Sequence, residues 1–315
     1  MIDFRYHLVS LIAVFLAVAL GIVIGTTALN PPLLADIKNQ VSALEKDKRS
    51  LEDRTQQLQS QVNSTDSFAD AVAPALVEGT LAGHSVLLVV TNKDVPSDSI
   101  DQLTSLIGDA GGTVSGTLTL QPEYSDPSTA ASLKNYVTGS GLPAGVSLPQ
   151  VDDAGQLVGS LLAQVLMIPR AGTAPDRAGI SSVLAGLSAL KVLTAEGDSV
   201  APADYAIVLT SGGFNGSDAA ARNATLADLV GALDAKGSGA IVAGDAGSAG
   251  DNGLVGAIRS DPALSTAIST VDNAATAAGR ISSVLALVSE GQGTSGKYGT
   301  GSDTQPVPPV PAATQ

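Results

Sequence analysis

The hydrophobic pattern of the chain begins with one long apolar run. No residue from Leu8 to Leu29 carries a charge, and only Ser10, Thr26 and Thr27 within it are polar. A helix of this length rises about 33 Å, which is enough to cross a hydrocarbon core of about 30 Å. The run therefore predicts a membrane anchor over residues 1–29. The anchor residues are Leu8, Leu11, Phe15, Leu16, Leu20 and Ile24.

A cleaved signal peptide is the alternative interpretation of this run, because Thr26-Thr27-Ala28 resembles a small-x-small cleavage site. The run is longer than the usual apolar region of a signal peptide, so we expect an uncleaved anchor. The short N-terminal tail favours a single pass through the cell membrane with the large C-terminal domain outside the cytoplasm. Basic residues beyond the run weaken this orientation under the positive-inside rule. They are Lys38, Lys46, Lys48 and Arg49.

Apolar residues at heptad spacing follow the anchor and predict a coiled-coil stalk. Asn30 and the Pro31-Pro32 pair resemble the cap and first turn of a new helix, where proline is tolerated. Leucine dominates one of the two seam positions, and anchors on one membrane impose a parallel direction, so the pattern favours a homodimer. The coiled-coil seam residues are Leu34, Ile37, Val41, Leu44, Leu51, Leu58 and Val62.

Four polar residues leave other arrangements of the stalk open. Lys48 and Thr55 weaken the middle of the seam. Asp47 and Glu52 would place like charges opposite each other in a parallel homodimer. One alternative is a single amphipathic helix packed on its own domain. The other is a partner helix of different sequence, which would relieve the repulsion.

A connecting helix is predicted to complete residues 30–82. It follows an expected turn at Asn63-Ser64-Thr65 and extends from Asp66 to Leu81. Pro74 lies inside it and is expected to kink or restart the helix, because proline removes a backbone donor.

Beyond the stalk, short apolar runs alternate with segments of helical spacing. The predicted strands are Ser85–Val90, Thr113–Leu120, Tyr205–Thr210, Gly239–Ala243 and a short one near Ile268–Val271. The predicted helices are Ile100–Ile107, Ser128–Val137, Ala154–Met167, Ile180–Leu190, Leu226–Leu233 and Ile281–Val288. This alternation predicts an α/β domain over residues 83–290, with a doubly wound, mostly parallel, Rossmann-like sheet. Residues 291–315 are rich in Gly, Ser, Thr, Pro and Gln, so we expect a disordered tail.

Composition narrows the chemistry open to the chain. It has no Trp, four Phe and five Tyr in 315 residues, so its core must consist of Val, Leu, Ile and Ala. The 30 acidic residues against 16 Lys and Arg give a net charge of −14, which speaks against nucleic-acid binding. The absence of cysteine excludes disulfides and thiolate chemistry. Two histidines (His7, His84) and two methionines (Met1, Met167) leave little soft-metal chemistry.

Two glycine-rich loops are the candidate ligand sites. Ser211–Gly216 and Gly244–Gly250 each follow a predicted strand and precede a predicted helix, where backbone N–H groups can hold an anion. Neither loop has the Gly-Lys-Ser/Thr ending of a P-loop, and neither matches Gly-x-Gly-x-x-Gly. Short turns in a glycine-rich protein are the alternative. We assign no cofactor to them.

The remaining polar residues form no catalytic pattern. Asp152-Asp153 and Asp245 with Asp251 come nearest to carboxylate clusters, but cation binding needs several converging oxygens. No serine lies in a Gly-x-Ser-x-Gly elbow, and only His84 could act as a base in the exported part. We therefore expect no enzyme activity, and we assign no catalytic, cofactor-binding or metal-ligating residue.

Several segments resemble a known family. The opening Asp3–Thr26, Leu81–Val86, Thr210–Gly213 and Gly296–Gly301 are similar, in the same order, to the actinobacterial copper transport protein B family. The resemblance implies an envelope protein associated with copper resistance, described for some members as an outer-membrane channel. Corynebacterial relatives look like septal proteins that pair with a cytosolic partner and promote cell separation through a peptidoglycan hydrolase. The family supplies no copper-ligand motif that can be placed on this sequence.

Two functions from different classes follow from these observations. The first is a single-pass envelope protein in copper homeostasis, which acts through scaffolding because one helix per chain encloses no channel lumen. The alternative is a structural or regulatory cell-division protein that contacts other envelope proteins. An exported enzyme has the least support. A separation defect at normal copper after deletion of the gene would favour the cell-division protein.

Overall fold

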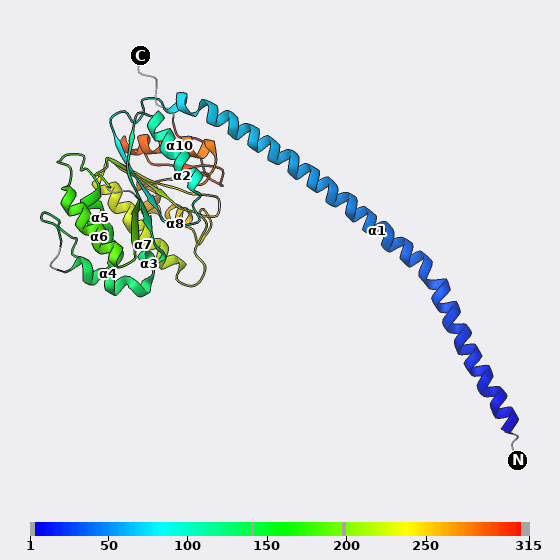
Figure 1. Ribbon diagram of the computed structural model, residues 1–315. Helices are drawn as coiled ribbons and strands as arrows, with labels where there is room; N and C mark the ends of the chain where they lie inside the picture. Colours follow the sequence, from blue (N-terminus) through cyan, green and yellow to red (C-terminus); the bar gives the residue numbers. More distant parts are fainter. Residues whose placement is uncertain (1–3, 140–141, 197–199, 310–315) are drawn as a thin grey trace. The chain divides into compact units, whose positions relative to one another are not determined.

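The computed structural model describes residues 4–139, 142–196 and 200–309 (Figure 1). Its first element is the 74-residue helix α1, which runs without a break from Phe4 to Val77. The expected new start at Asn30 and Pro31-Pro32, the turn at Asn63–Thr65 and the restart at Pro74 are therefore wrong. A proline inside a helix lacks an N–H donor, and its ring crowds the carbonyl four residues earlier, at a cost of about 3 kcal/mol. Helix α1 nevertheless continues on both sides of Pro31-Pro32 and of Pro74.

The first part of α1 carries the predicted anchor and seam. Arg5–Thr26 has a mean hydropathy of 2.9, and in the described part of the chain it is the one helix long and apolar enough to cross a membrane. All six anchor residues are exposed. The seam residues from Ile37 to Val62 are exposed as well, whereas the side chain of Leu34 lies outside the described residues.

The chain divides into two compact units, Met1–Thr65 and Asp66–Gln315. The last turns of α1 belong to the second unit, because Ala73 and Val77 are buried in its core. Asp66 caps the N-terminus of the helix Ala277–Gly291 (α10), since its Oδ1 accepts a hydrogen bond of 2.7 Å from the backbone N–H of Ala277. The compact domain thus includes most of the helix that the sequence indicated as a connector.

A seven-stranded sheet with the order β3-β2-β1-β4-β5-β6-β7 forms the centre of this unit. All neighbouring strands are parallel except β2 and β3, which are antiparallel. The prediction of an α/β fold with a mostly parallel sheet is therefore confirmed. The strands are β1 Ser85–Val90, β2 Thr113–Leu120, β3 Leu193–Glu196, β4 Tyr205–Leu209, β5 Gly239–Ala243, β6 Ser269–Val271 and β7 Lys297–Tyr298.

Helices cover both faces of the sheet (Figure 1). They are α2 Ser97–Asp109, α3 Pro122–Ser125, the 3-10 turn Pro127–Thr129, α4 Ala130–Val137, α5 Ala154–Leu166, α6 Arg177–Ala189, α7 Ala219–Lys236, α8 Leu254–Ser260, α9 Pro262–Ala267 and α10 Ala277–Gly291. In β1, Leu87 and Val89 pack into the core with α4 to α8, while Val86 and Leu88 pack with α1, α2 and α10. Burial on both faces explains why this strand reads as a continuous apolar run.

The C-terminal segment differs from the expected disordered tail. Strand β7 pairs with β6, and Tyr298 is buried. The backbone N–H groups of Thr300 and Gly301 then donate to the Asp272 carboxylate, at 2.7 and 3.1 Å. Residues 310–315 lie outside the described residues.

Candidate functional site

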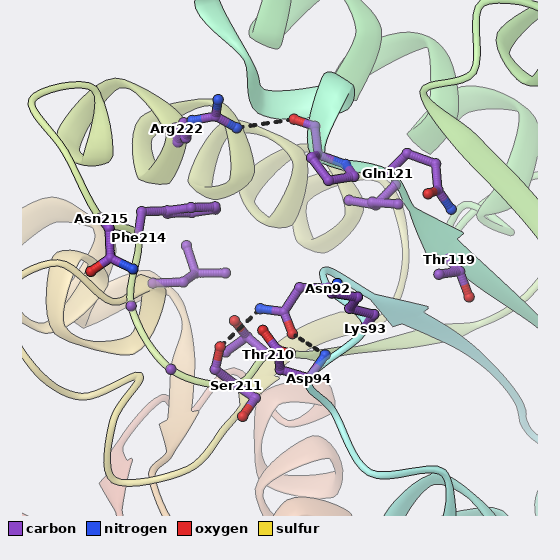
Figure 2. Close-up of a pocket in the computed structure, with 15 residues that line it drawn as sticks. Asn92, Lys93, Asp94, Thr119, Gln121, Thr210, Ser211, Phe214, Asn215 and Arg222 are labelled. Atoms are coloured by element: carbon purple, nitrogen blue, oxygen red, sulfur yellow. Dashed lines mark hydrogen bonds between the residues drawn. The ribbon is translucent and has the colours of Figure 1, made fainter.

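The topology of the sheet creates a crevice at the carboxyl ends of β1 and β4. The chain leaves β1 toward β2 on one side, and β4 lies on the other side of β1. Such a switch point is where open α/β sheets bind ligands. A cavity of about 550 Å³ lies there (Figure 2). It is lined by Asn92, Lys93, Asp94, Thr119, Leu120, Gln121, Pro122, Thr210, Ser211, Gly212, Gly213, Phe214, Asn215, Arg222 and Leu254. The predicted loop Ser211–Gly216 therefore contributes one wall.

Asn92 joins the ends of the two central strands. Its Nδ2 donates a 2.8 Å hydrogen bond to the carbonyl of Ser211, which follows β4 (Figure 2). Its Oδ1 accepts a 3.1 Å bond from the backbone N–H of Asp94. The Asn92 side-chain amide thus holds the two loops of the cavity wall in place through these hydrogen bonds.

Arg222, near the start of α7, holds the opposite wall together. Its Nε donates to Asp218 at 2.7 Å, and its two terminal nitrogens donate to Asp126 at 2.5 Å and to the Pro122 carbonyl at 3.1 Å. Its guanidinium also lies 5.6 Å from the centre of the Phe214 ring. The hydrogen bond with Asp218 raises the pKa of Arg222 most, and Asp126 raises it further. This cation is therefore neutralised by the protein and is not free to clamp an anion.

Asp245 connects the two glycine-rich loops that the sequence pointed out separately. Its Oδ2 accepts from the Ser211 hydroxyl at 2.7 Å, and its Oδ1 accepts from the N–H groups of Gly212 and Ser248 at 2.9 and 2.8 Å. Burial acts to raise the pKa of Asp245, but these hydrogen bonds outweigh it and hold the pKa below its ordinary value. The Asp245 carboxylate therefore accepts the hydrogen bonds of the loop donors that the sequence predicted for an anionic ligand.

The remaining lining is mixed in character. Hydroxyl and amide groups come from Thr119, Gln121 and Asn215, and apolar walls come from Leu120, Pro122, Phe214 and Leu254. No His, Cys or Glu is among the lining residues in the part of the chain that the structure describes. Groups of this kind suit a small molecule with a polar edge and an apolar face.

The predicted carboxylate pairs serve separate structural roles. Asp152 forms an ion pair with Lys134, while the Oδ1 of Asp153 caps α5 by accepting from the N–H of Gln156 at 2.9 Å. Asp251 is exposed, and Asp245 is used as described. Within the described ranges there is no group of three or more His, Cys, Asp or Glu residues that could hold a metal ion.

His84 and Met167 occupy different environments. His84 precedes β1, with its Nδ1 3.7 Å from the Oδ2 of Asp204 and its ring edge-on to Tyr205. Met167, at the end of α5, is fully buried in the hydrophobic core. Its thioether therefore contributes to packing.

Asp272 and Arg259 form a buried ion pair that the sequence did not indicate. The Arg259 Nη1 lies 2.7 Å from the Asp272 Oδ2, and the Asp272 side chain is 1% exposed. A Cβ at Gly299 would collide with this carboxylate, and Gly299 has a φ of +129°. The glycines of Gly296–Gly301 were the available signal, because they allow the backbone to approach a buried charge.

Comparison with known proteins covers nearly the whole chain. The family described as "Copper transport outer membrane protein, MctB" matches residues 1–309. Copper transporter MctB of Mycobacterium tuberculosis is 34% identical over 307 residues, which cover 96% of this chain and 97% of that protein. Copper transporter MctB of Mycobacterium leprae is 33% identical over 311 residues, with the same coverage. The match runs from the apolar helix through the sheet to the Gly296–Gly301 segment, so this chain belongs to the MctB copper transport family.

Proposed function

We propose that this protein acts in copper homeostasis as a single-pass protein of the cell envelope, and that it acts as a scaffold for other envelope components. The observation that carries the proposal is the uninterrupted helix α1. It begins in an apolar span and ends in turns buried in the α/β domain, in a chain of the MctB family. Such a helix ties a binding domain to a membrane.

The architecture gives little support to conduction of copper by this chain. In the described residues one helix is long and apolar enough to cross a membrane, and one helix encloses no lumen. A ring of such helices could surround a pore, but residues 8–29 contain no charge with which to select a cation.

The available copper ligands are also few. Copper(I) prefers thiolate and thioether ligands, and imidazole suits copper(II). The chain has no cysteine, and Met167 is buried in the core. His84 lies beside Asp204 and Tyr205, and a single imidazole falls short of a selective site. Any copper phenotype therefore arises through envelope integrity or through a partner.

The orientation with the domain outside the cytoplasm belongs to the same proposal. It rests on the single apolar span Arg5–Thr26 and on the large domain that follows it. A reporter that works only in the cytoplasm, fused after Gln315, should be inactive. Activity of that reporter would reverse the orientation.

The exposed seam supports a homodimer as the assembled form. Leu44 and Leu51 are 70% and 65% exposed in the single chain, and they repeat with Leu58 at a spacing of seven. Burial of each leucine contributes on the order of 1.5–3 kcal/mol, which favours pairing with a second copy of the same helix.

Deletion and complementation test the proposed function. Cells that lack the gene should grow poorly in elevated copper, and a plasmid copy carrying His84→Ala should restore growth as well as the unmodified gene. Isothermal titration of the purified chain with copper(I) and copper(II) should show no stoichiometric, sub-micromolar site. Tight binding that His84→Ala abolishes would contradict the scaffold role. Chained cells at normal copper would instead support the cell-division alternative.

A further inference from the structure

A second cavity lies where α7 passes the beginnings of α4 and α5. Its volume is about 290 Å³. It is lined by Tyr124, Asp126, Pro127, Ala130, Leu133, Asp153, Ala154, Gly155, Ala221, Ala224, Thr225 and Asp228. No basic residue is among these described lining residues, so the acidic groups decide the character of the cavity.

Two of the three carboxylates have partners. Asp126 accepts from Arg222 and from the N–H of Ser128, and the Oδ1 of Asp153 caps α5. Asp228 is half-buried, and within the described residues its carboxylate has no hydrogen bond and no ion pair. A partly desolvated carboxylate without a partner is costly, so it calls for a cation.

A separate observation comes from Tyr124 in the same lining. The side chain is 2% exposed, and its hydroxyl has no hydrogen-bond partner in the described part of the chain. Burial raises the pKa of Tyr124 most, and the charge of Asp228, which lines the same cavity, raises it further. The large majority of buried polar side-chain atoms in native proteins have a hydrogen-bond partner, so the Tyr124 hydroxyl needs an explanation.

Gly155 brings the two acidic side chains to one space. A Cβ at this glycine would lie 3.1 Å from the Oδ1 of Asp153 and 3.2 Å from the Oδ2 of Asp228. Burial, followed by the charge of Asp153, raises the pKa of Asp228 to about 6. The repulsion implied by this shift would be relieved by a positive group between the two carboxylates.

The walls of the cavity decide between an organic cation and a metal ion. Ca²⁺ takes six to eight oxygen ligands, whereas most of this lining is methyl and methylene surface from Ala130, Leu133, Ala154, Ala221 and Ala224. An ammonium on a methylene chain matches both the apolar walls and the carboxylates of the cavity. The methylene chain can pack on the apolar surface while the ammonium donates hydrogen bonds to the carboxylates.

We propose that this cavity binds a primary alkylammonium group, whose N–H donors reach Asp228, Asp153 and the Tyr124 oxygen. The group is carried either by a free amine or by a lysine side chain of another protein. Both sources share the same chemistry, and two probes separate them.

Isothermal titration of the full chain in detergent micelles tests this site. The probes are 1,5-diaminopentane for a free amine and Nα-acetyl-lysine amide for a lysine side chain. At least one probe should bind with a stoichiometry of one, and the probe with the higher affinity identifies the source. Asp228→Asn should weaken that binding by about tenfold or more, and Tyr124→Phe should weaken it by less, because the phenol oxygen accepts a hydrogen bond but carries no charge opposite to the ammonium.

Three controls make the result decisive. Asp251→Asn removes the same charge at an exposed position and should leave the affinity unchanged. Choline, which carries a cation without N–H donors, should bind more weakly than the probe. Thermal unfolding confirms that each variant is folded. The proposal is overturned if neither amine binds, if Asp228→Asn leaves their affinity unchanged, or if Ca²⁺ alone binds in an Asp228-dependent manner.

Discussion

Asp70 and Arg280 join the end of the long helix to the α/β domain. The Arg280 Nη2 lies 2.8 Å from the Asp70 Oδ1, and its Nη1 donates to the carbonyl of Ala275 at 2.9 Å. The arginine side chain is 5% exposed and the aspartate is half-exposed. The Asp70 carboxylate of α1 is therefore the counter-charge of the nearly buried Arg280 guanidinium.

Removal of that carboxylate should destabilise the domain. Asp70→Ala leaves the buried guanidinium without its counter-charge, at a cost on the order of 1–3 kcal/mol. Urea unfolding followed by circular dichroism should show the loss. Asp53→Ala, at an exposed position on the same helix, serves as the control and should change stability by less than about 0.5 kcal/mol. Equal stability of the two variants would show that the pair contributes nothing.

The seam can be tested with a single introduced thiol, since the chain has no cysteine. Leu44→Cys should form a disulfide-linked dimer in oxidised membranes, because this position faces its counterpart in a parallel coiled coil. Lys46→Cys, two residues away and outside the seam, is the matched control. Addition of Leu51→Asp to Leu44→Cys should abolish the cross-link on non-reducing gels. Equal cross-linking at positions 44 and 46 would point to random collision.

Asp245 should block phosphate binding by the glycine-rich loops. In Asp245→Ala, the Ser211 hydroxyl and the N–H groups of Gly212 and Ser248 lose their acceptor. The variant should be less stable, and phosphate should raise its melting temperature by several degrees more than that of the unmodified chain. Sodium chloride at equal ionic strength is the control. No specific effect of phosphate would mean that the loops depend on Asp245 for their shape.

Stability should fall as pH rises through neutrality because of Glu290. Burial raises its pKa to about 7, although hydrogen bonds from Ser269 and Ser295 act in the opposite direction. The pKa of this carboxyl is higher in the folded state than its ordinary value of 4.5, so its contribution to stability is fully present below pH 4.5. That contribution is lost as the pH rises through the folded-state pKa of about 7. Melting temperatures from pH 5 to 8 should therefore decline less steeply in Glu290→Gln. An identical slope in both proteins would remove Glu290 as the cause.

Gly299 should tolerate no side chain. Gly299→Ala would force a methyl group against the Asp272 carboxylate and would need a φ that alanine rarely adopts. We expect a loss of about 2 kcal/mol or more in urea unfolding. Gly293→Ala is a matched control for the backbone effect, because it also has a positive φ but has open space around it. A similar loss in both would assign the cost to the backbone alone.

The fold was largely readable from the sequence where the signal is local. Fully buried strands such as β1 and β5 appear as continuous apolar runs, and the apolar span is plain. Strand β3, with the sequence Leu-Thr-Ala-Glu, has no such run because it lies at the edge of the sheet. The continuity of α1 through Pro31-Pro32 was not predicted. A local sequence pattern treats proline as the start of a new helix, whereas the long helical segments on both sides outweigh its cost.

The candidate sites depended on contacts between distant parts of the chain. The sequence located both glycine-rich loops, but the role of Asp245 follows from the adjacency of β4 and β5, which sets Ser211 beside it. The meeting of Asp228 with Asp153 likewise needs α5 and α7 to touch at Gly155. The ordering of Tyr298 required a partner strand about 27 residues earlier.

Asp245 also competes with any external ligand for the hydrogen-bond donors of Ser211 and Gly212 in the switch-point cavity. Any external anion that sought the Ser211 and Gly212 donors would have to displace a carboxylate that is tethered in place. Tethered groups act at effective concentrations in the millimolar range, and a folded loop holds its group at least as well as a flexible linker does. The Ser211 and Gly212 donors are therefore closed to phosphate in the surroundings, and a molecule that enters the cavity must be recognised by other groups of its lining.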